Sequence, residues 1–228
     1  MTYFHYLASA ITSLFVIATL HQMLQGAWRR FPLLFLYLLL LLLLSVPLAI
    51  AFFRSGSQWT TMSATVYWIL ALLTQGIGIL CVLAITRTAT EKHAGAARIV
   101  RLMAAGTVLV LLGSLLAHWH YLSAFVYNRW LTHISRDLAV LSIVLNLLLW
   151  SRLLADRKRD PLVVLISAGL GVQFTGDAMG HALRYFPNEL KDLGNLVFAG
   201  TTVLASFIWF RAFQRDAAKL PAKVGASL

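Results

Sequence analysis

Four polar residues stand at helical spacing inside an otherwise apolar stretch of the chain, and their types are those found in binding sites. They are Gln173, Asp177, His181 and Arg184, separated by four, four and three positions. In an α-helix this spacing places all four side chains on one face. A carboxylate four residues from an imidazole can share a metal ion with it or orient its ring.

A second group of histidines and acids lies upstream. His133 precedes Asp137 by the same four positions, whereas His118 and His120 are two apart and so point to nearly opposite sides of a helix. We expect one pocket, between the helices that carry these groups, with ligand-binding residues Asp177, His181, His118, Asp137, Gln173 and Arg184. The candidate metal ligands are His181, Asp177 and His133.

Several uses of these residues remain open. In the structural alternative, Arg184 neutralises Asp177 or Asp137, and the histidines are ordinary residues of a membrane interface. In the functional alternatives they line an outward-facing pocket for a small ligand or ion, form a metal-dependent hydrolase, or ligate haem. An acid inside a membrane span costs a few kcal/mol, which makes Asp177 a functional hypothesis by default. No cofactor is expected apart from a candidate divalent metal.

The composition sets the solvent in which these residues must work. Hydrophobic residues make up 60% of the chain and charged residues only 12%, about half the charged fraction of a soluble domain. The net charge of +11 comes from basic residues in short loops beside apolar runs, where they contact lipid headgroups rather than nucleic acid. The lone cysteine, Cys81, excludes an intramolecular disulfide and is expected in the core.

The apolar runs predict an all-α polytopic membrane protein with seven transmembrane helices. They form a single domain over residues 1–213, followed by a cytoplasmic tail over 214–228. The predicted spans are 4–24, 32–53, 62–86, 99–127, 135–154, 161–185 and 193–213. The fifth and sixth spans reach full length only if charged residues such as Asp137 and Asp177 lie within them.

The loops alternate in charge, and this alternation predicts the orientation. Of the 19 Lys and Arg residues, 14 fall on one side of the seven spans and five on the other. By the positive-inside rule the N-terminus lies outside and the C-terminus in the cytoplasm. His118, His120, Asp177 and His181 then lie at one depth, about 24 to 30 Å from the inner ends of their helices.

Other residues are expected to hold the helices together. Gly176 and Gly180 form a small-xxx-small motif typical of close helix packing, and the lone amides Gln75 and Asn146 are expected to bond across helices. Six tryptophans lie at the expected levels of the two interfacial belts. They are Trp59, Trp119 and Trp130 outside and Trp28, Trp150 and Trp209 inside.

Two seven-helix families are excluded by their ligand residues. A microbial rhodopsin needs a lysine in its last helix, and the run 193–213 has none. The ceramidase-like and adiponectin-receptor-like hydrolases hold zinc with histidines of an early helix and the last helix, and spans 32–53, 62–86 and 193–213 contain no histidine.

Another pattern covers most of the chain. It consists of Tyr67-Trp68, Ser135-Arg136-Asp137, the glycine-rich run 161–185 and Trp209. In this the chain resembles short, uncharacterised seven-helix bacterial integral membrane proteins, which implies a topology and no activity. It is also similar in outline to membrane-embedded sensor domains of bacterial signalling proteins, which are normally fused to an output domain.

The sequence therefore favours a binding or sensory component of the cell inner membrane with an extracytoplasmic polar pocket. Its alternatives are a metal-dependent membrane-embedded hydrolase and a small transporter subunit. The expected partners are the lipid bilayer and a separate cytoplasmic signalling protein, since the tail is too short for an output domain.

Overall fold

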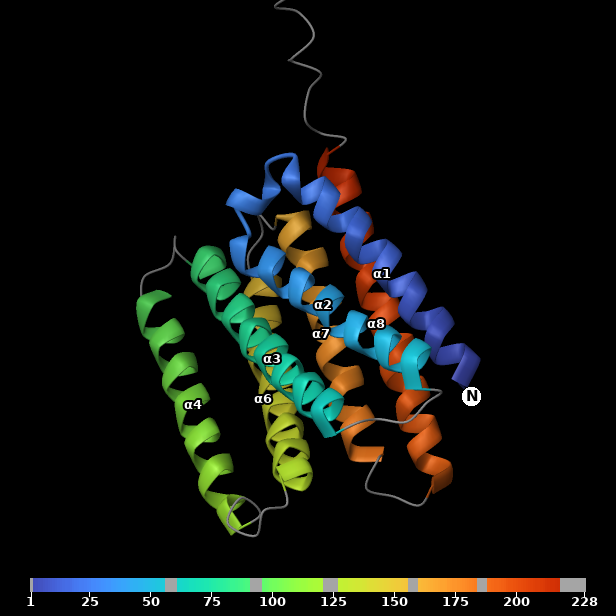
Figure 1. The fold of residues 1–228 in the computed structure, drawn as a ribbon. Coiled ribbons are helices and arrows are strands. Elements are labelled where there is room, and N and C mark those ends of the chain that lie inside the picture. The colour runs from blue at the N-terminus through green and yellow to red at the C-terminus, as the bar shows by residue number, and fades with distance from the viewer. Residues whose placement is uncertain are drawn as a thin grey trace, which may run out of the picture.

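The structure is an all-α bundle (Figure 1), described by a computed structural model over residues 2–55, 61–90, 96–120, 127–155, 160–183 and 188–217. The described part of the chain has seven α-helices and one short 3-10 helix. They are α1 (Thr2–Leu24), η1 (Ala27–Arg29), α2 (Pro32–Ser55), α3 (Thr61–Thr90), α4 (Ala96–Ala117), α6 (Tyr127–Ala155), α7 (Pro161–Leu183) and α8 (Asn188–Ala217).

Six helices are long and apolar enough to cross a membrane, which supports the prediction of a multi-pass membrane protein. They are α1, α3, α4, α6, α7 and α8. A full span needs about 20 apolar residues to cross a hydrocarbon core of about 30 Å.

Successive helices run in opposite directions along the bundle (Figure 1). The N-terminus of α1 and the C-terminal end of α8 consequently lie at opposite ends. The end that carries η1 and the last turn of α8 also holds eight exposed arginines of the described residues. These are Arg29, Arg30, Arg87, Arg98, Arg101, Arg152, Arg211 and Arg215.

Helix α7 lies at the centre of the bundle and α4 at its edge. In the span of α7, 61% of residues are buried, compared with 11% in the span of α4. Helix α7 packs against α3, α6 and α8, whereas α4 packs against only α3 and α6 among the described elements. Figure 1 shows α4 at the periphery, where its apolar surface suits contact with lipid.

Glycines of α7 allow the close approach of α8, as the small-xxx-small motif predicts. A Cβ atom added at Gly176 would lie 2.5 Å from the Cβ of Thr201, and one at Gly180 would lie 3.1 Å from the Cβ of Phe198. Small residues at such positions let two helix backbones pack closely within a membrane.

Trp209 corrects the prediction of an inner aromatic belt. Its side chain is fully buried rather than interfacial, and its Nε1 donates a hydrogen bond of 3.2 Å to the carbonyl oxygen of Ile166. The ring packs edge-to-face on Tyr37 and fills the space left by the missing side chain of Gly169. Trp28 and Trp119 are exposed, as a belt requires, and Trp59 lies outside the described residues.

The predicted ends of two helices differ from the structure. Helix α4 ends at Ala117 and is followed by a turn at His118, ten residues before the predicted end of that span. Helix α6 begins at Tyr127 instead of 135. The charges near its start do not break the helix, because Asp137 is paired with Arg136 and with polar groups of α4.

Candidate functional site

A cavity that carries several polar side chains on a largely apolar lining lies between α2, α3, α6, α7 and α8. It offers about 40 Å³ to the centres of water-sized molecules. A single water needs about 10 to 15 Å³ by this measure, so the cavity has room for two or three waters or for a small ion with some of its hydration. The lining residues are Tyr37, Leu41, Leu44, Ala71, Thr74, Gln75, Ser135, Gln173, Phe174, Asp177, His181 and Phe198.

Helix α7 supplies the main polar wall of this cavity. Gln173, Asp177 and His181 are all at least nine-tenths buried and line the cavity together, as their spacing predicts. Asp177 lies six residues before the end of α7, which corresponds to about 9 Å along the axis. The cavity therefore lies toward the end of the bundle opposite the exposed arginines.

The orientation of the Gln173 amide is fixed by its neighbours. Its Nε2 donates to Oδ1 of Asp177 at 2.7 Å and to Oγ1 of Thr202 at 3.2 Å. The hydroxyl of Thr202 donates its own proton to the carbonyl oxygen of Phe198 at 2.8 Å, so it must accept from Gln173. The amide nitrogen therefore faces these two acceptors, and the buried Oε1 of Gln173 has no hydrogen-bond partner.

Gln75 presents the same arrangement from α3. Its Nε2 donates to the backbone carbonyl oxygen of Ser135 at 3.0 Å, which confirms that this amide bonds across helices. Oε1 of Gln75 and Oγ of Ser135 are buried without a hydrogen-bond partner. Among the residues that the structure describes, three oxygens of cavity-lining side chains, on α3, α6 and α7, thus have no hydrogen-bond partner.

His181 lies beside an aromatic wall. Its ring stacks on that of Trp68 from α3, with centroids 6.4 Å apart and planes inclined by 24°. His181 is buried although it lies two residues from the end of α7. This contact places an indole fluorophore beside the cavity.

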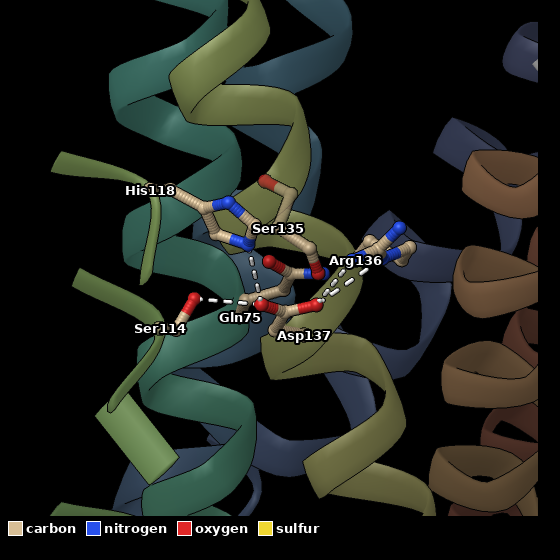
Figure 2. A network of polar contacts seen from close by, with 6 residues as sticks. All are labelled: Gln75, Ser114, His118, Ser135, Arg136 and Asp137. Atoms are coloured by element: carbon tan, nitrogen blue, oxygen red, sulfur yellow. Dashed lines mark hydrogen bonds and ion pairs between the residues drawn. The ribbon is translucent and has the colours of Figure 1, made fainter. Parts of the chain in front are cut away.

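A second polar cluster joins α4 to the beginning of α6 (Figure 2). Asp137 is its centre: Oδ2 accepts from the hydroxyl of Ser114 at 2.8 Å and lies 3.2 Å from Nε2 of His118. Oδ1 accepts from Nε and from a terminal nitrogen of Arg136, at 3.1 and 3.0 Å. His133 stacks on His118 with ring centroids 4.5 Å apart.

The predicted site residues therefore divide between two places. Asp177, His181 and Gln173 line the cavity, whereas His118, His133 and Asp137 belong to the cluster against α4. The expectation of one pocket that includes the helix of His118 does not match this arrangement, because α4 does not contact α7. Arg184 lies outside the described residues.

Geometry on α6 explains this division. Ser135 and Asp137 are two residues apart, so their side chains leave the helix about 200° apart. The backbone carbonyl of Ser135 accepts the bond from Gln75 and Ser135 lines the cavity, whereas the carboxylate of Asp137 accepts from Ser114 of α4 (Figure 2). The shared depth of the titratable groups was therefore not sufficient to place them in one pocket.

The three candidate metal ligands are not brought together. Within the described residues, no group of three or more His, Cys, Asp or Glu side chains is arranged to hold a metal ion. Asp177 and His181 lie at the cavity, but His133 stacks on His118. The structure therefore disagrees with the predicted set of three metal ligands, His181, Asp177 and His133.

From the sequence, Gln75 is predicted only to form a structural hydrogen bond across helices, and Tyr37 and Thr74 have no predicted role. These hydroxyl and amide groups lie among apolar residues of α2 and α3, so no spacing signal links them to Asp177. The common signal that was available is that each lies within an apolar run.

Comparison with models of known protein families, with curated proteins and with solved structures gives no match for this chain. Its function must therefore be inferred from the geometry of the two polar clusters.

Proposed function

We propose that this chain is a seven-span membrane protein that binds a small polar ligand or ion in the cavity around Asp177, as a binding or sensory component. The observation that carries the proposal is the set of three buried oxygens, of Gln75, Gln173 and Ser135, that have no hydrogen-bond partner among the described residues although the three residues line one cavity. Leaving such an acceptor buried and unsatisfied costs about 1 to 3 kcal/mol. A bound molecule that interacts with these oxygens would offset this cost.

Topology supports an extracytoplasmic location for the cavity. The eight exposed arginines lie at the opposite end of the bundle, and by the positive-inside rule that end faces the cytoplasm. In this orientation the N-terminus is outside, α2 is the seventh span, and the protein resides in the cell inner membrane. A signal from the cavity would pass to a separate cytoplasmic partner.

The proposed orientation can be tested with single cysteines. In a Cys81→Ala background, we expect Asp192→Cys to react with a membrane-impermeant maleimide in intact cells. Gln214→Cys is expected to react only after the cells are made permeable. Both positions are exposed, at opposite ends of α8, so the pair forms its own control. The reverse pattern of labelling would contradict the orientation.

Ligand binding can be tested with a defined panel of compounds on the purified full-length protein. The panel contains amino acids, small carboxylates, ammonium and metal chlorides, and the readout is the thermal midpoint followed by tryptophan fluorescence. We expect at least one compound to raise the midpoint by about 2 to 5 °C at about ten times its Kd. Asp177→Asn should remove that response.

Asp160→Asn is the matched control for this experiment. Asp160 lies at the opposite end of α7, where it caps the helix through the amide of Leu162 and pairs with Arg30. Asparagine preserves the cap, so the response to the active compound should persist. A response that survives equally in Asp177→Asn, or a panel with no active compound, would contradict the proposed function.

A further inference from the structure

We infer that the cavity is a site for a small monovalent cation such as sodium, ligated by the oxygens of Gln75, Gln173 and Ser135 and balanced by the carboxylate of Asp177. This inference rests on the proposed binding function and assigns its ligand class. The side chains of all four residues are at least nine-tenths buried, and all four line the same cavity.

The donor atoms determine the class of ligand. Both amide nitrogens are already directed at protein acceptors, Nε2 of Gln173 at Asp177 and Nε2 of Gln75 at the carbonyl of Ser135. Oxygen atoms are therefore the groups that these side chains can offer to a ligand. Amide and hydroxyl oxygens with a carboxylate are the ligands of hard cations such as those of sodium, magnesium and calcium.

The charge of the cavity distinguishes between these cations. Asp177 is the only acidic residue in its lining, and no lysine or arginine of the described residues lines it. One carboxylate balances one positive charge, whereas calcium sites commonly use several carboxylates. An ion of charge +2 would retain an excess of positive charge in a medium where isolated charge is costly.

The size of the cavity is consistent with a small cation. About 40 Å³ available to water-sized molecules admits an ion together with one or two waters. The donors lie on α3, α6 and α7, so binding would link α3 to two helices from the second half of the chain. It would thereby stabilise the folded protein by RT ln(1 + c/Kd), where c is the free cation concentration, so the stabilisation rises with that concentration.

Thermal unfolding of the full-length protein in nanodiscs of neutral lipid tests the inference. Choline chloride is replaced by sodium chloride at constant ionic strength and pH, with potassium and calcium chloride in parallel. We expect sodium to raise the midpoint by about 2 to 5 °C at about ten times its Kd. Ser135→Ala should weaken the apparent affinity about tenfold, the effect of losing about 1.4 kcal/mol.

Ser142→Ala is the matched control, because it removes another buried serine hydroxyl from α6 that bonds to Leu138 and does not line the cavity. Its response to sodium should equal that of the unmodified protein. Ser135→Ala also preserves the bond from Gln75, which uses the backbone carbonyl of Ser135, so this variant is expected to fold. Asp177→Asn should abolish the response.

Three outcomes would overturn the inference: equal midpoints in sodium and choline, a response to calcium but not to sodium, or equal sodium responses in Ser135→Ala and Ser142→Ala. If an amino acid or carboxylate of the panel acts through Asp177 while sodium does not, the cation assignment fails and the proposed function stands. If no compound acts, both fail.

Discussion

Gly176→Ala is expected to destabilise the bundle although it adds only one methyl group. The new Cβ would overlap with Oγ1 of Thr201 and would lie 2.5 Å from its Cβ. Rotation of the Thr201 side chain moves its oxygen but leaves its Cβ in place, so α7 and α8 must separate. Overpacking of this kind typically costs about 1 to 3 kcal/mol, and we expect a value in this range or above it.

Gly113→Ala is expected to change the stability in the opposite direction and to stabilise the protein. A Cβ at Gly113 in α4 would meet no atom within 4 Å, and alanine is favoured over glycine in a helix by about 1 kcal/mol. Thermal or denaturant unfolding should therefore separate the two variants clearly. The double variant Gly176→Ala, Thr201→Gly removes the opposing Cβ and should recover part of the loss. Equal stabilities for Gly176→Ala and Gly113→Ala would show that α7 and α8 do not pack this closely.

Asp137→Ala should produce the second large effect, because it removes the centre of the cluster that attaches α4 to α6. Ser114 and His118 of the α4 region and Arg136 of α6 all contact this carboxylate. Fully buried ion pairs cost about 3 to 5 kcal/mol to break, but the side chains of Asp137 and Arg136 are 24% and 35% exposed. We therefore expect a loss of about 2 kcal/mol in the free energy of unfolding.

Two comparisons make this prediction specific. Asp160→Asn disrupts the more exposed ion pair with Arg30 and should cost less than about 1 kcal/mol. Ser114→Ala should destabilise the unmodified protein but have little effect once Asp137 is alanine, because the hydrogen bond is already lost. Additive effects of the two substitutions would indicate that Ser114 and Asp137 do not interact.

The Asp137 prediction also separates the two polar clusters functionally. Asp137 does not line the cavity, so a folded Asp137→Asn variant should retain any response that depends on Asp177. The sequence placed both acids in one set of ligand-binding residues. The structure instead gives Asp137 bonds that hold α4, while Asp177 lines the cavity with Gln173.

Features set by local composition and spacing were predictable from the sequence. Apolar runs determine the helices, since a backbone in hydrocarbon must satisfy its own hydrogen bonds. The four-residue spacing of Gln173, Asp177 and His181 placed them on one face of α7, where the structure has them. Glycines of α7 indicated close packing, which Gly176 and Thr201 show.

Features that depend on how the helices are arranged required the tertiary structure. Tryptophan is a residue type typical of membrane interfaces, but the ring of Trp209 is buried in the space left by the missing side chain of Gly169. His118 and His181 are predicted at one depth, yet α4 contacts α6 and not α7, so the two histidines lie in different clusters. The depth of a residue along the bilayer follows from its position in the sequence. The direction in which each helix faces, and the helices that it contacts, depend on side-chain packing.

Gln75 and Ser135 illustrate the same distinction at the cavity. Each is a lone polar residue in an apolar run, with no periodic pattern that connects it to Asp177. Only the packing of α3 against α6 and α7 brings their oxygens to one cavity. The helices, their charge asymmetry and the polar face of α7 can be read from the amino-acid sequence, because they follow from local periodicity and loop charge. Which of those polar groups meet depends on the tertiary packing, because contacts between helices depend on the packing of all their side chains.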